Sequence, residues 1–179
     1  MWDRLHTVPG YPPQSVMAAA AVLIPLYEDQ AGDIRVVLTK RPDTMPTHAG
    51  HIAFPGGRPH EDDDGPVATA LREAQEEVGI DPSQVAIIGF LPPIHTVEFS
   101  LLVVPVVGRL SGIPDLQPSE REVAGIFQPR LEDLAHDDLW VFHLWRGRQL
   151  WFFDLDGDVL WGATARIVRK LVGLEPLFD

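Results

Sequence analysis

Three glutamates, Glu73, Glu76 and Glu77, are the residues of this sequence best suited to chemistry. Side chains three and four positions apart are neighbours on an α-helix, so we expect these carboxylates to project to one side of a helix. Like charges held together repel one another, and more strongly when they are partly buried. Bound divalent cations would remove this repulsion, so the cluster predicts a metal site.

The metal expected at these glutamates is a hard cation. The sequence has no cysteine, which excludes thiolate ligands and disulfides, and no histidine constellation suited to zinc. Mg²⁺ prefers carboxylate oxygens and retains several waters, so we expect Mg²⁺, or Mn²⁺ in its place. The formal net charge of −12 disfavours binding to nucleic acid or to an anionic membrane. A phosphate-bearing substrate would therefore need its charge bridged by a metal or by arginines.

A glutamate-rich helical face is, in most sequences, a solvated surface. The neighbouring residues favour a site here, because the expected helix follows the run Phe54-Pro55-Gly56-Gly57 and the acidic loop Glu61-Asp62-Asp63-Asp64. Glycines before a metal-binding helix let the backbone approach a metal or a phosphate closely.

The apolar pattern predicts the elements that position the glutamates. A helix is expected over Pro66–Val78, with proline in its first turn and Gly79 at its end. A second helix is expected where apolar residues recur between Leu160 and Leu174. The expected strands are Met17–Tyr27, Ile34–Lys40, Val85–Phe90 and Phe99–Val107, with a hairpin of Trp140–Trp145 and Gln149–Asp154. This combination indicates an α/β (α+β) fold with a mixed sheet packed between helices.

The length of 179 residues fits one domain, expected to cover residues 1–179 with a Pro-rich amino-terminal arm over residues 1–16. We expect this arm either to contact a partner subunit in a homodimer or to fray. Apolar runs are far shorter than the ~20 residues of a membrane-spanning helix. The amino terminus also lacks a basic segment ahead of a long apolar one. We therefore expect a cytoplasmic protein with no membrane partner.

Between Gly57 and Ile80 the sequence resembles the box of the Nudix hydrolases, G-x5-E-x7-R-E-U-x-E-E-x-G-U, where U is aliphatic. The half from Arg72 to Ile80 matches once Ala74 is accepted at the first U. In the other half, Gly57 lies fifteen positions before Arg72 where the pattern has fourteen, and Asp stands where Glu is expected. The resemblance implies the Nudix α/β/α sandwich and a metal-dependent hydrolase.

The segment before the box, residues 37–57, resembles the signature of the coenzyme A pyrophosphatase branch of this family. That signature runs Leu-Leu-Thr-x-Arg-(Ser/Ala)-x3-Arg-x3-Gly-x3-Phe-Pro-Gly-Gly. Arg41, Gly50 and the run Phe54–Gly57 are in register, whereas Pro42 replaces the small residue and Pro46 replaces the second arginine. Later segments of this chain also resemble the branch, so the similarity covers most of the chain, over residues 18–174.

The resemblance implies a role for each residue of the cluster. Glu76 and Glu77 would be direct metal ligands. Glu73 would be a further ligand, or the carboxylate that orients and deprotonates the attacking water. Gly57 would offer its carbonyl oxygen to a metal.

Arg72 is expected to point the other way round the helix and to fix the acidic loop by a charge-assisted hydrogen bond to Asp63 or Asp64. Its contribution to catalysis would then be indirect. The residues expected to contact the substrate are Arg41, His48 and Gly56.

Nudix enzymes often add a carboxylate from a later loop as metal ligand or base. Glu122, just before an apolar strand, is the preferred candidate by register with the branch. Glu120 in the same loop and Glu98 beside Phe99 are the alternatives.

Three functions remain open at this stage. The first is hydrolysis of the pyrophosphate of coenzyme A or its acyl derivatives to 3′,5′-ADP and (acyl-)4′-phosphopantetheine. The second is a Nudix pyrophosphatase acting on ADP-ribose, another nucleoside diphosphate derivative or a nucleoside triphosphate, which Pro46 would permit. The third is a binding module without turnover, which three mutually repelling carboxylates argue against.

Overall fold

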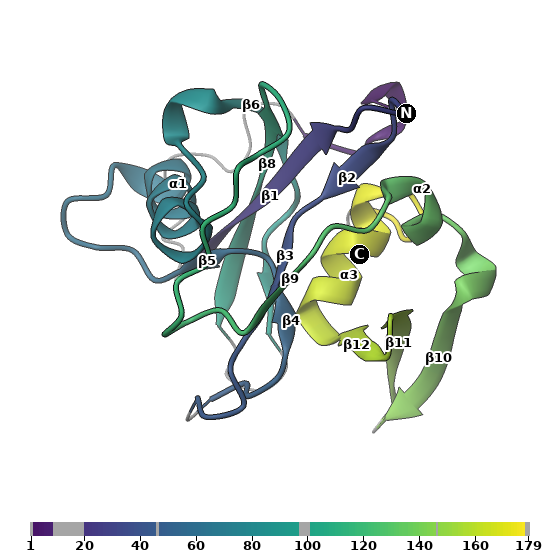
Figure 1. The fold of residues 1–179 in the computed structure, drawn as a ribbon. Coiled ribbons are helices and arrows are strands. Elements are labelled where there is room, and N and C mark those ends of the chain that lie inside the picture. The colour runs from purple at the N-terminus through teal and green to yellow at the C-terminus, as the bar shows by residue number, and fades with distance from the viewer. Residues whose placement is uncertain (1, 9–19, 46, 97–100, 146, 178–179) are drawn as a thin grey trace.

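The computed structural model describes residues 2–8, 20–45, 47–96, 101–145 and 147–177, which form three sheets and several helices (Figure 1). The largest sheet contains β1 (Ala20–Glu28), β2 (Ile34–Val36), β5 (Gly56–Gly57), β6 (Val85–Phe90), β7 (Ile94–His95) and β8 (Leu102–Leu110). The second contains β3 (Leu38–Lys40), β4 (Ile52–Ala53) and β9 (Gly125–Phe127), and the third β10 (Trp140–Trp145), β11 (Arg148–Leu155) and β12 (Asp158–Trp161). The helices are α1 (Gly65–Val78), α2 (Leu131–Leu134) and α3 (Gly162–Leu171), with short 3₁₀ turns η1 (Trp2–Arg4), η2 (Pro82–Gln84) and η3 (Asp137–Leu139).

The largest sheet is mixed, because β1 and β8 run parallel at its centre while its other pairs are antiparallel. Both faces of β1 are buried. Successive side chains of a strand point to opposite faces, so Leu23 joins the core on the α1 side while Ile24 and Leu26 join the core on the α3 side. The sheet therefore separates two apolar cores.

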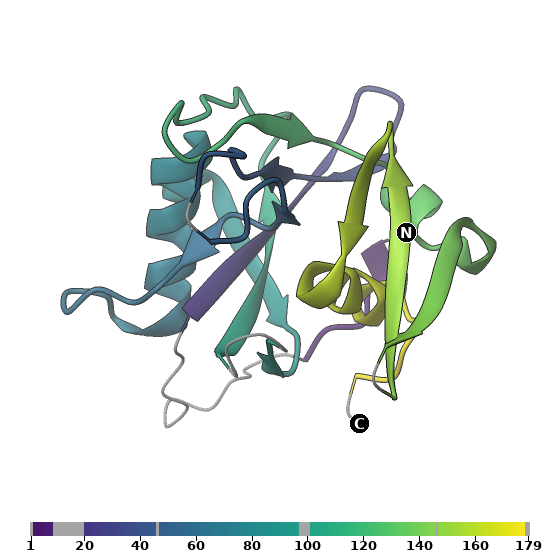
Figure 2. The ribbon, with the colours of Figure 1, turned by 90° about the horizontal axis from the view of Figure 1, so that it is seen from below.

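The layers are visible from below, where α1 lies on one side of the sheet and α3 on the other (Figure 2). The sheet of β10, β11 and β12 lies beyond α3, whose buried residues Ile167, Val168 and Leu171 belong to the same core as Phe153 and Leu160. This arrangement confirms the expected mixed sheet between helices.

Two strand predictions, Val85–Phe90 and Trp140–Trp145, coincide with β6 and β10. The prediction of one strand over Ile34–Lys40 is wrong, because the segment divides at Val37 into β2, paired with β1, and β3, paired with β9. The Val37 amide donates to the Pro25 carbonyl at 3.0 Å, at the point where the chain changes partner. The sequence of an apolar run does not show where the chain changes its partner strand.

The second helix is shorter than predicted. Leu160 belongs to β12, a strand that the sequence did not reveal, and α3 begins two residues later, at Gly162. Leu160 faces Phe153 across the β11–β12 pair and is fully buried there. A buried leucine two residues before a helix falls into the spacing of the helix's own apolar residues, so periodicity extended the helix too far.

Residues 2–8 of the expected arm pack against their own chain. The Trp2 ring lies under the Arg109 guanidinium at 4.4 Å, its Nε1 donates to Glu28, and Val8 bridges to Phe90. Residues 9–16 lie outside the described residues, so the homodimer stays a prediction. Within the described part of the chain, no helix has the length and apolar composition to cross a membrane.

Candidate active site

The rotation of α1 on the sheet is fixed by its small apolar stripe. Ala70, Ala74 and Val78 are fully buried against the large sheet. The helix ends at Gly79, whose φ of 73° is left-handed and whose amide donates to the carbonyl of the preceding turn. A β-carbon here would lie 2.9 Å from Cβ of Gln117, so glycine also lets a later loop approach the helix end.

Two glycines bring backbone against the glutamates of α1. Gly56 and Gly57 form β5, paired antiparallel with β1. A β-carbon on Gly56 would collide with the carbonyl oxygen of Ala21, and one on Gly57 would lie 2.6 Å from the carboxylate carbon of Glu73. A side chain is thus excluded at Gly56 by backbone, one at Gly57 would displace the carboxylate of Glu73, and the backbone of β5 lies directly beside α1.

Glu77 is a buried carboxylate, with 6% of the residue exposed, and its Oε2 accepts a hydrogen bond from the Gly56 amide at 3.3 Å. Burial raises the pKa of Glu77 from 4.5 to about 8, and the negative charges of Glu73 and Glu122 add to this effect. The amide hydrogen bond and the positive charge of Arg41 lower the pKa but do not compensate. A cation placed here would relieve the unfavourable negative charge.

Arg72 fixes the acidic loop through Asp63, which of the two candidate aspartates is the one it contacts. Nε and Nη2 of Arg72 donate to the two carboxylate oxygens of Asp63, both at 3.0 Å. The same carboxylate accepts from the Thr69 hydroxyl at 2.9 Å and from the His60 amide at 2.8 Å. These bonds, the one to Arg72 first, hold the pKa of Asp63 well below its usual range.

The expectation that Arg72 points away from the glutamates is wrong. Its Nη1 donates to Glu73 at 2.9 Å and to Glu76 at 3.2 Å. Residues four apart are neighbours on a helix, and the long guanidinium side chain reaches carboxylates on both sides of it. Arg72 therefore joins the acidic loop to two glutamates of the cluster.

The loop that carries Glu122 is attached to the end of α1. The Ser119 amide donates to the Glu77 carbonyl at 2.8 Å, and the Glu122 amide donates to the Ser119 carbonyl at 3.0 Å. This attachment brings Glu122 near enough for its charge to raise the pKa of Glu77. Glu120 and Glu122 are both exposed, and Glu98 lies outside the described residues.

Arg41 is the cation of the signature loop whose charge acts on Glu77 of the cluster. Its backbone bonds to His51 and Gly50, at 3.0 and 3.2 Å, fix the start of the loop. Its Nε is buried and has no hydrogen-bond acceptor among the described residues. Since its positive charge also lowers the pKa of Glu77, the guanidinium lies near the glutamates. Its Nε can still donate a hydrogen bond to a ligand.

His48, the other expected substrate contact in this loop, has a left-handed φ of 54°. Its ring lies 5.2 Å from that of His51, measured between centroids. Pro46, which stands at the position of the second signature arginine, lies outside the described residues.

The residues at the end of β5 and on α1 suit a hard divalent cation. They are carboxylates beside a backbone strand that carries no side chain, and the buried one is destabilised in its charged form. In the structure as it stands, Arg72 takes the place of a cation between Glu73 and Glu76. Among the described residues, no three acidic, histidine or cysteine side chains are arranged as metal ligands.

Known proteins are similar to this chain in sequence and in fold. The NUDIX domain model matches residues 17–145. "Nudix hydrolase 22, chloroplastic" of Arabidopsis thaliana is 41% identical over 161 residues, which are 84% of this chain and 53% of that protein. The chain thus spans about half the length of that relative. "Uncharacterized Nudix hydrolase NudL" of Escherichia coli K12 is 39% identical over 167 residues, 88% of this chain and 84% of that protein.

Solved structures agree with the fold. A Caenorhabditis elegans Ap4A hydrolase in a binary complex has a TM-score of 0.54 and 26% identity, over 64% of this chain and 81% of its own. A MutT/nudix family protein from Enterococcus faecalis has a TM-score of 0.57 over 92% of this chain and 62% of its own, and at 18% identity it supports the fold alone. The match over residues 17–145, the two sequence relatives and the glutamate helix beside the glycine strand agree. The chain belongs to the Nudix hydrolase family.

Proposed function

We propose that the protein hydrolyses the pyrophosphate bond of coenzyme A, or of its acyl derivatives, to 3′,5′-ADP and (acyl-)4′-phosphopantetheine with the help of a divalent metal. The observation that carries this proposal is Arg41, a signature-loop arginine beside the glutamates whose buried Nε has no acceptor in the described part of the chain. A guanidinium with unused donors next to a metal site suits a diphosphate oxygen.

Glu73, Glu76 and Glu77, with the Gly57 carbonyl and Glu122, are the groups that would hold Mg²⁺ or Mn²⁺. The metal would neutralise the diphosphate and make its phosphorus more electrophilic. Binding requires Arg72 to give up its bonds to two of these glutamates, while its bidentate bond to Asp63 keeps it in the loop.

The hydrolysis adds one water across a P–O–P linkage. The water oxygen bonds to one phosphorus, the bridging oxygen leaves on the other phosphate, and the proton goes to a carboxylate base. Glu122 and Glu73 are the candidates for this base, and Arg41 would hold a phosphate oxygen against the site. Glu122 suits the role of the base because the Ser119 amide attaches its loop to α1 independently of the acidic loop.

A second candidate is another nucleoside diphosphate derivative, such as ADP-ribose or a dinucleoside polyphosphate. Pro46 supports it, because proline replaces the second signature arginine, which would otherwise bind the 3′-phosphate of coenzyme A. A structural relative at 26% identity is named an Ap4A hydrolase, which also favours a substrate with two or more linked phosphates.

The experiment is a substrate panel with Mg²⁺ or Mn²⁺ and product identification by mass. It contains coenzyme A, acyl-coenzyme A, ADP-ribose, NADH, dinucleoside polyphosphates and nucleoside triphosphates. Formation of 3′,5′-ADP from coenzyme A supports the proposal. Brisk hydrolysis of ADP-ribose with no reaction of coenzyme A would overturn it in favour of the second candidate, and no turnover of any substrate would favour a binding module.

The base is tested by Glu122→Gln against the matched loop variant Glu120→Gln. Loss of a group at the reacting centre lowers kcat far more than it raises KM, so Glu122→Gln is expected to lower kcat about tenfold or more. Glu120→Gln is expected to stay near the unmodified enzyme. The reverse order would move the role to Glu120.

A further inference from the structure

We propose that the outer face of the β10–β11–β12 sheet binds the apolar tail of the substrate, the acyl chain of an acyl-coenzyme A. This proposal rests on the proposed function, because it deepens the choice of substrate at the same site. We call the residues concerned the outer row: Trp161, Phe152 and Val141, one from each strand.

The outer row is a continuous line of apolar side chains across three strands. Phe152 is the register partner of both Trp161 and Val141, and directly paired residues share one face of an antiparallel sheet. The rings of Phe152 and Trp161 are stacked with 6.2 Å between centroids, and the ring of His143 meets Phe152 edge-on at 5.5 Å. With strands about 4.8 Å apart, the row is elongated, about 10 Å from end to end.

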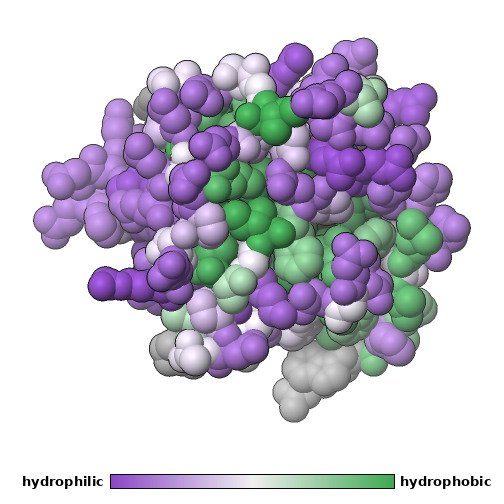
Figure 3. All heavy atoms as spheres, in the orientation of Figure 1, coloured by the Kyte–Doolittle hydropathy of each residue, from purple (hydrophilic) through white to green (hydrophobic). Residues whose placement is uncertain are grey.

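The opposite face of the same sheet shows what a covered row looks like. There, Trp140, Phe153 and Leu160 occupy the paired positions next in sequence and are at most 8% exposed, because α3 packs on them. By contrast, Val141 is 56% exposed and Trp161 37% exposed. The space-filling view has hydrophobic surface at the edge of the molecule over β10 and its neighbours (Figure 3).

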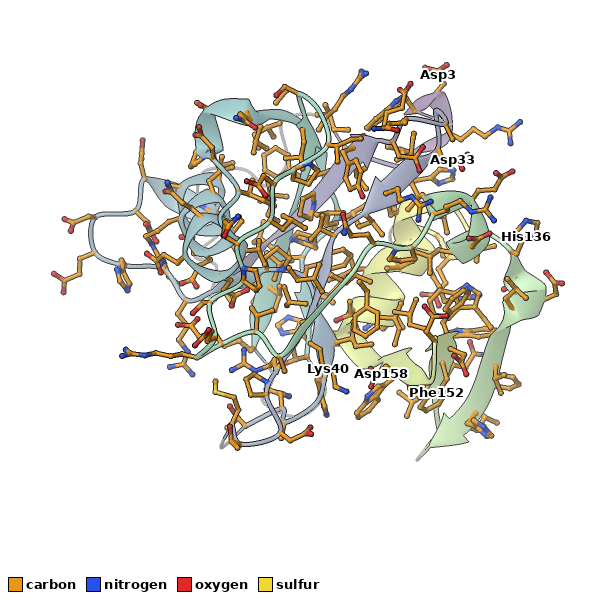
Figure 4. All side chains as sticks on the ribbon, in the orientation of Figure 1. Asp3, Asp33, Lys40, His136, Phe152 and Asp158 are labelled. Carbon is orange, nitrogen blue, oxygen red and sulfur yellow. The ribbon has the colours of Figure 1, made fainter. Side chains whose placement is uncertain are left out.

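One end of the outer row reaches the signature loop. The rings of Trp161 and His51 are 4.8 Å apart, and the carbonyl of His51 accepts the amide hydrogen of Arg41 at 3.0 Å. The Lys40–Asp158 ion pair, 2.7 Å long, ties the residue before Arg41 to the start of β12 (Figure 4). The row therefore begins at the loop that would hold the diphosphate and runs away from the glutamates.

This continuity with the candidate active site decides what covers the row. A nucleobase would stack on one ring only. An extended chain anchored by its diphosphate near Arg41 would lie along all three side chains. A tethered tail needs no second binding event, so a partly exposed apolar strip is sufficient to retain it. The exposed apolar residues Phe142 and Leu144 lie on the other face by the alternation of the strand, so they serve as controls.

The test compares coenzyme A with octanoyl-coenzyme A, which differ only in the tail. Dissociation constants are measured by calorimetry in EDTA, where no metal-assisted hydrolysis occurs, and kcat/KM is measured with Mg²⁺. We expect octanoyl-coenzyme A to bind at least about tenfold more tightly, the effect of burying roughly two methylene groups. Trp161→Ala is expected to remove most of that ratio, and Val141→Asn to reduce it for dodecanoyl- more than for butanoyl-coenzyme A. The control Leu144→Ala should preserve it.

Three results would overturn the proposal. Equal binding of the two ligands would show that no tail is held. Equal weakening of both by Trp161→Ala would mean that the ring contacts a part that the two ligands share, the nucleotide or the pantetheine arm, and not the acyl chain. A change of solution mass in that variant, measured by light scattering, would mean that a second copy covers the row. The proposed function fails separately: if neither ligand is hydrolysed but the tail still tightens binding, the row stands and the reaction does not.

Discussion

Two arginines, the half-buried Arg72 and the buried Arg169, each stabilise one half of this molecule, and they do so in different ways. Arg72 bonds to carboxylates of the acidic loop and of its own helix. The guanidinium of Arg169, in α3, instead lies 3.6 Å from the centroid of Trp151 and 5.2 Å from that of Trp140. It also pairs with a carboxylate on each side, Asp137 at 2.9 Å and Glu175 at 3.1 Å.

The difference teaches which contacts are available for chemistry. In the proposed function, the glutamate partners of Arg72 would exchange the arginine for a metal ion, because both cations satisfy a carboxylate. The aromatic partners of Arg169 have no such alternative ligand, and only 2% of that residue is exposed. We therefore expect substitutions around Arg72 to affect activity and substitutions of Arg169 to affect folding.

The largest expected effect is on turnover. Glu76→Gln and Glu77→Gln should each lower kcat by about 10²-fold or more, because an electrostatic contact to the transition state is lost. Folding stability without metal should not fall for Glu77→Gln, since burial and neighbouring charges already disfavour its carboxylate. Rates are measured with saturating Mg²⁺, and unfolding with urea. Near-normal turnover in both variants would refute the metal assignment.

The matching variant in the other half is Arg169→Ala. Removing a desolvated cation from two indole rings, together with its packing, should lower the free energy of unfolding by about 2–3 kcal/mol. Both carboxylates it leaves behind reach solvent, so the loss stays below that of a fully buried ion pair. The urea midpoint should fall while kcat of the folded fraction is retained. A drop in kcat at unchanged stability would break the contrast between the two arginines.

A smaller effect is expected for Asp63→Asn. The loss of one charge-assisted pair should cost about 1–2 kcal/mol, and Arg72, less firmly held, should compete better for Glu73 and Glu76. The Mg²⁺ concentration for half-maximal activity should then rise several-fold. Since the pKa of Asp63 is lowered by folding, its contribution is complete above its usual pKa and disappears as pH falls below it. The variant should therefore show a weaker loss of stability in acid than the unmodified protein.

The smallest expected effect is the number of protons released when the metal binds. Because folding raises the pKa of Glu77 to about 8, the folded protein without metal is stabilised by the protonated form and loses that advantage as pH rises from 4.5 to about 8. Metal binding within that window must displace the proton, so apparent Mg²⁺ affinity should rise with pH up to about 8. Calorimetry in buffers of different ionisation enthalpy should count up to one proton released at pH 7. Release that is the same in Glu77→Gln would assign the proton to another group.

The sequence was most informative where the functional residues are close together along the chain. Glu73, Glu76 and Glu77 fall within five positions, so helix geometry alone places them together. The glycines of β5 could likewise be recognised from the run that contains them. The mixed sheet between helices followed from the order of apolar segments, and the structure confirms it.

The structure was needed where partners are distant or where two residue types look alike. Sequence could not choose between Asp63 and Asp64, because the choice depends on which carboxylate meets Arg72 and Thr69. It also gave Arg72 the wrong direction, since the conformation of a long side chain follows from its surroundings.

By itself, the sequence predicted a metal site and determined the helix that carries the glutamates and the class of fold, because these depend on local spacing and on alternation of apolar residues. Only the tertiary structure decided that Glu77 is buried, that the charge of Arg41 acts on it and that the outer row joins the signature loop. Burial and the charges around a group are set by segments far apart in the chain, such as β5, α1 and the loop before β9. Their distances are fixed only when the sheet and both cores have formed.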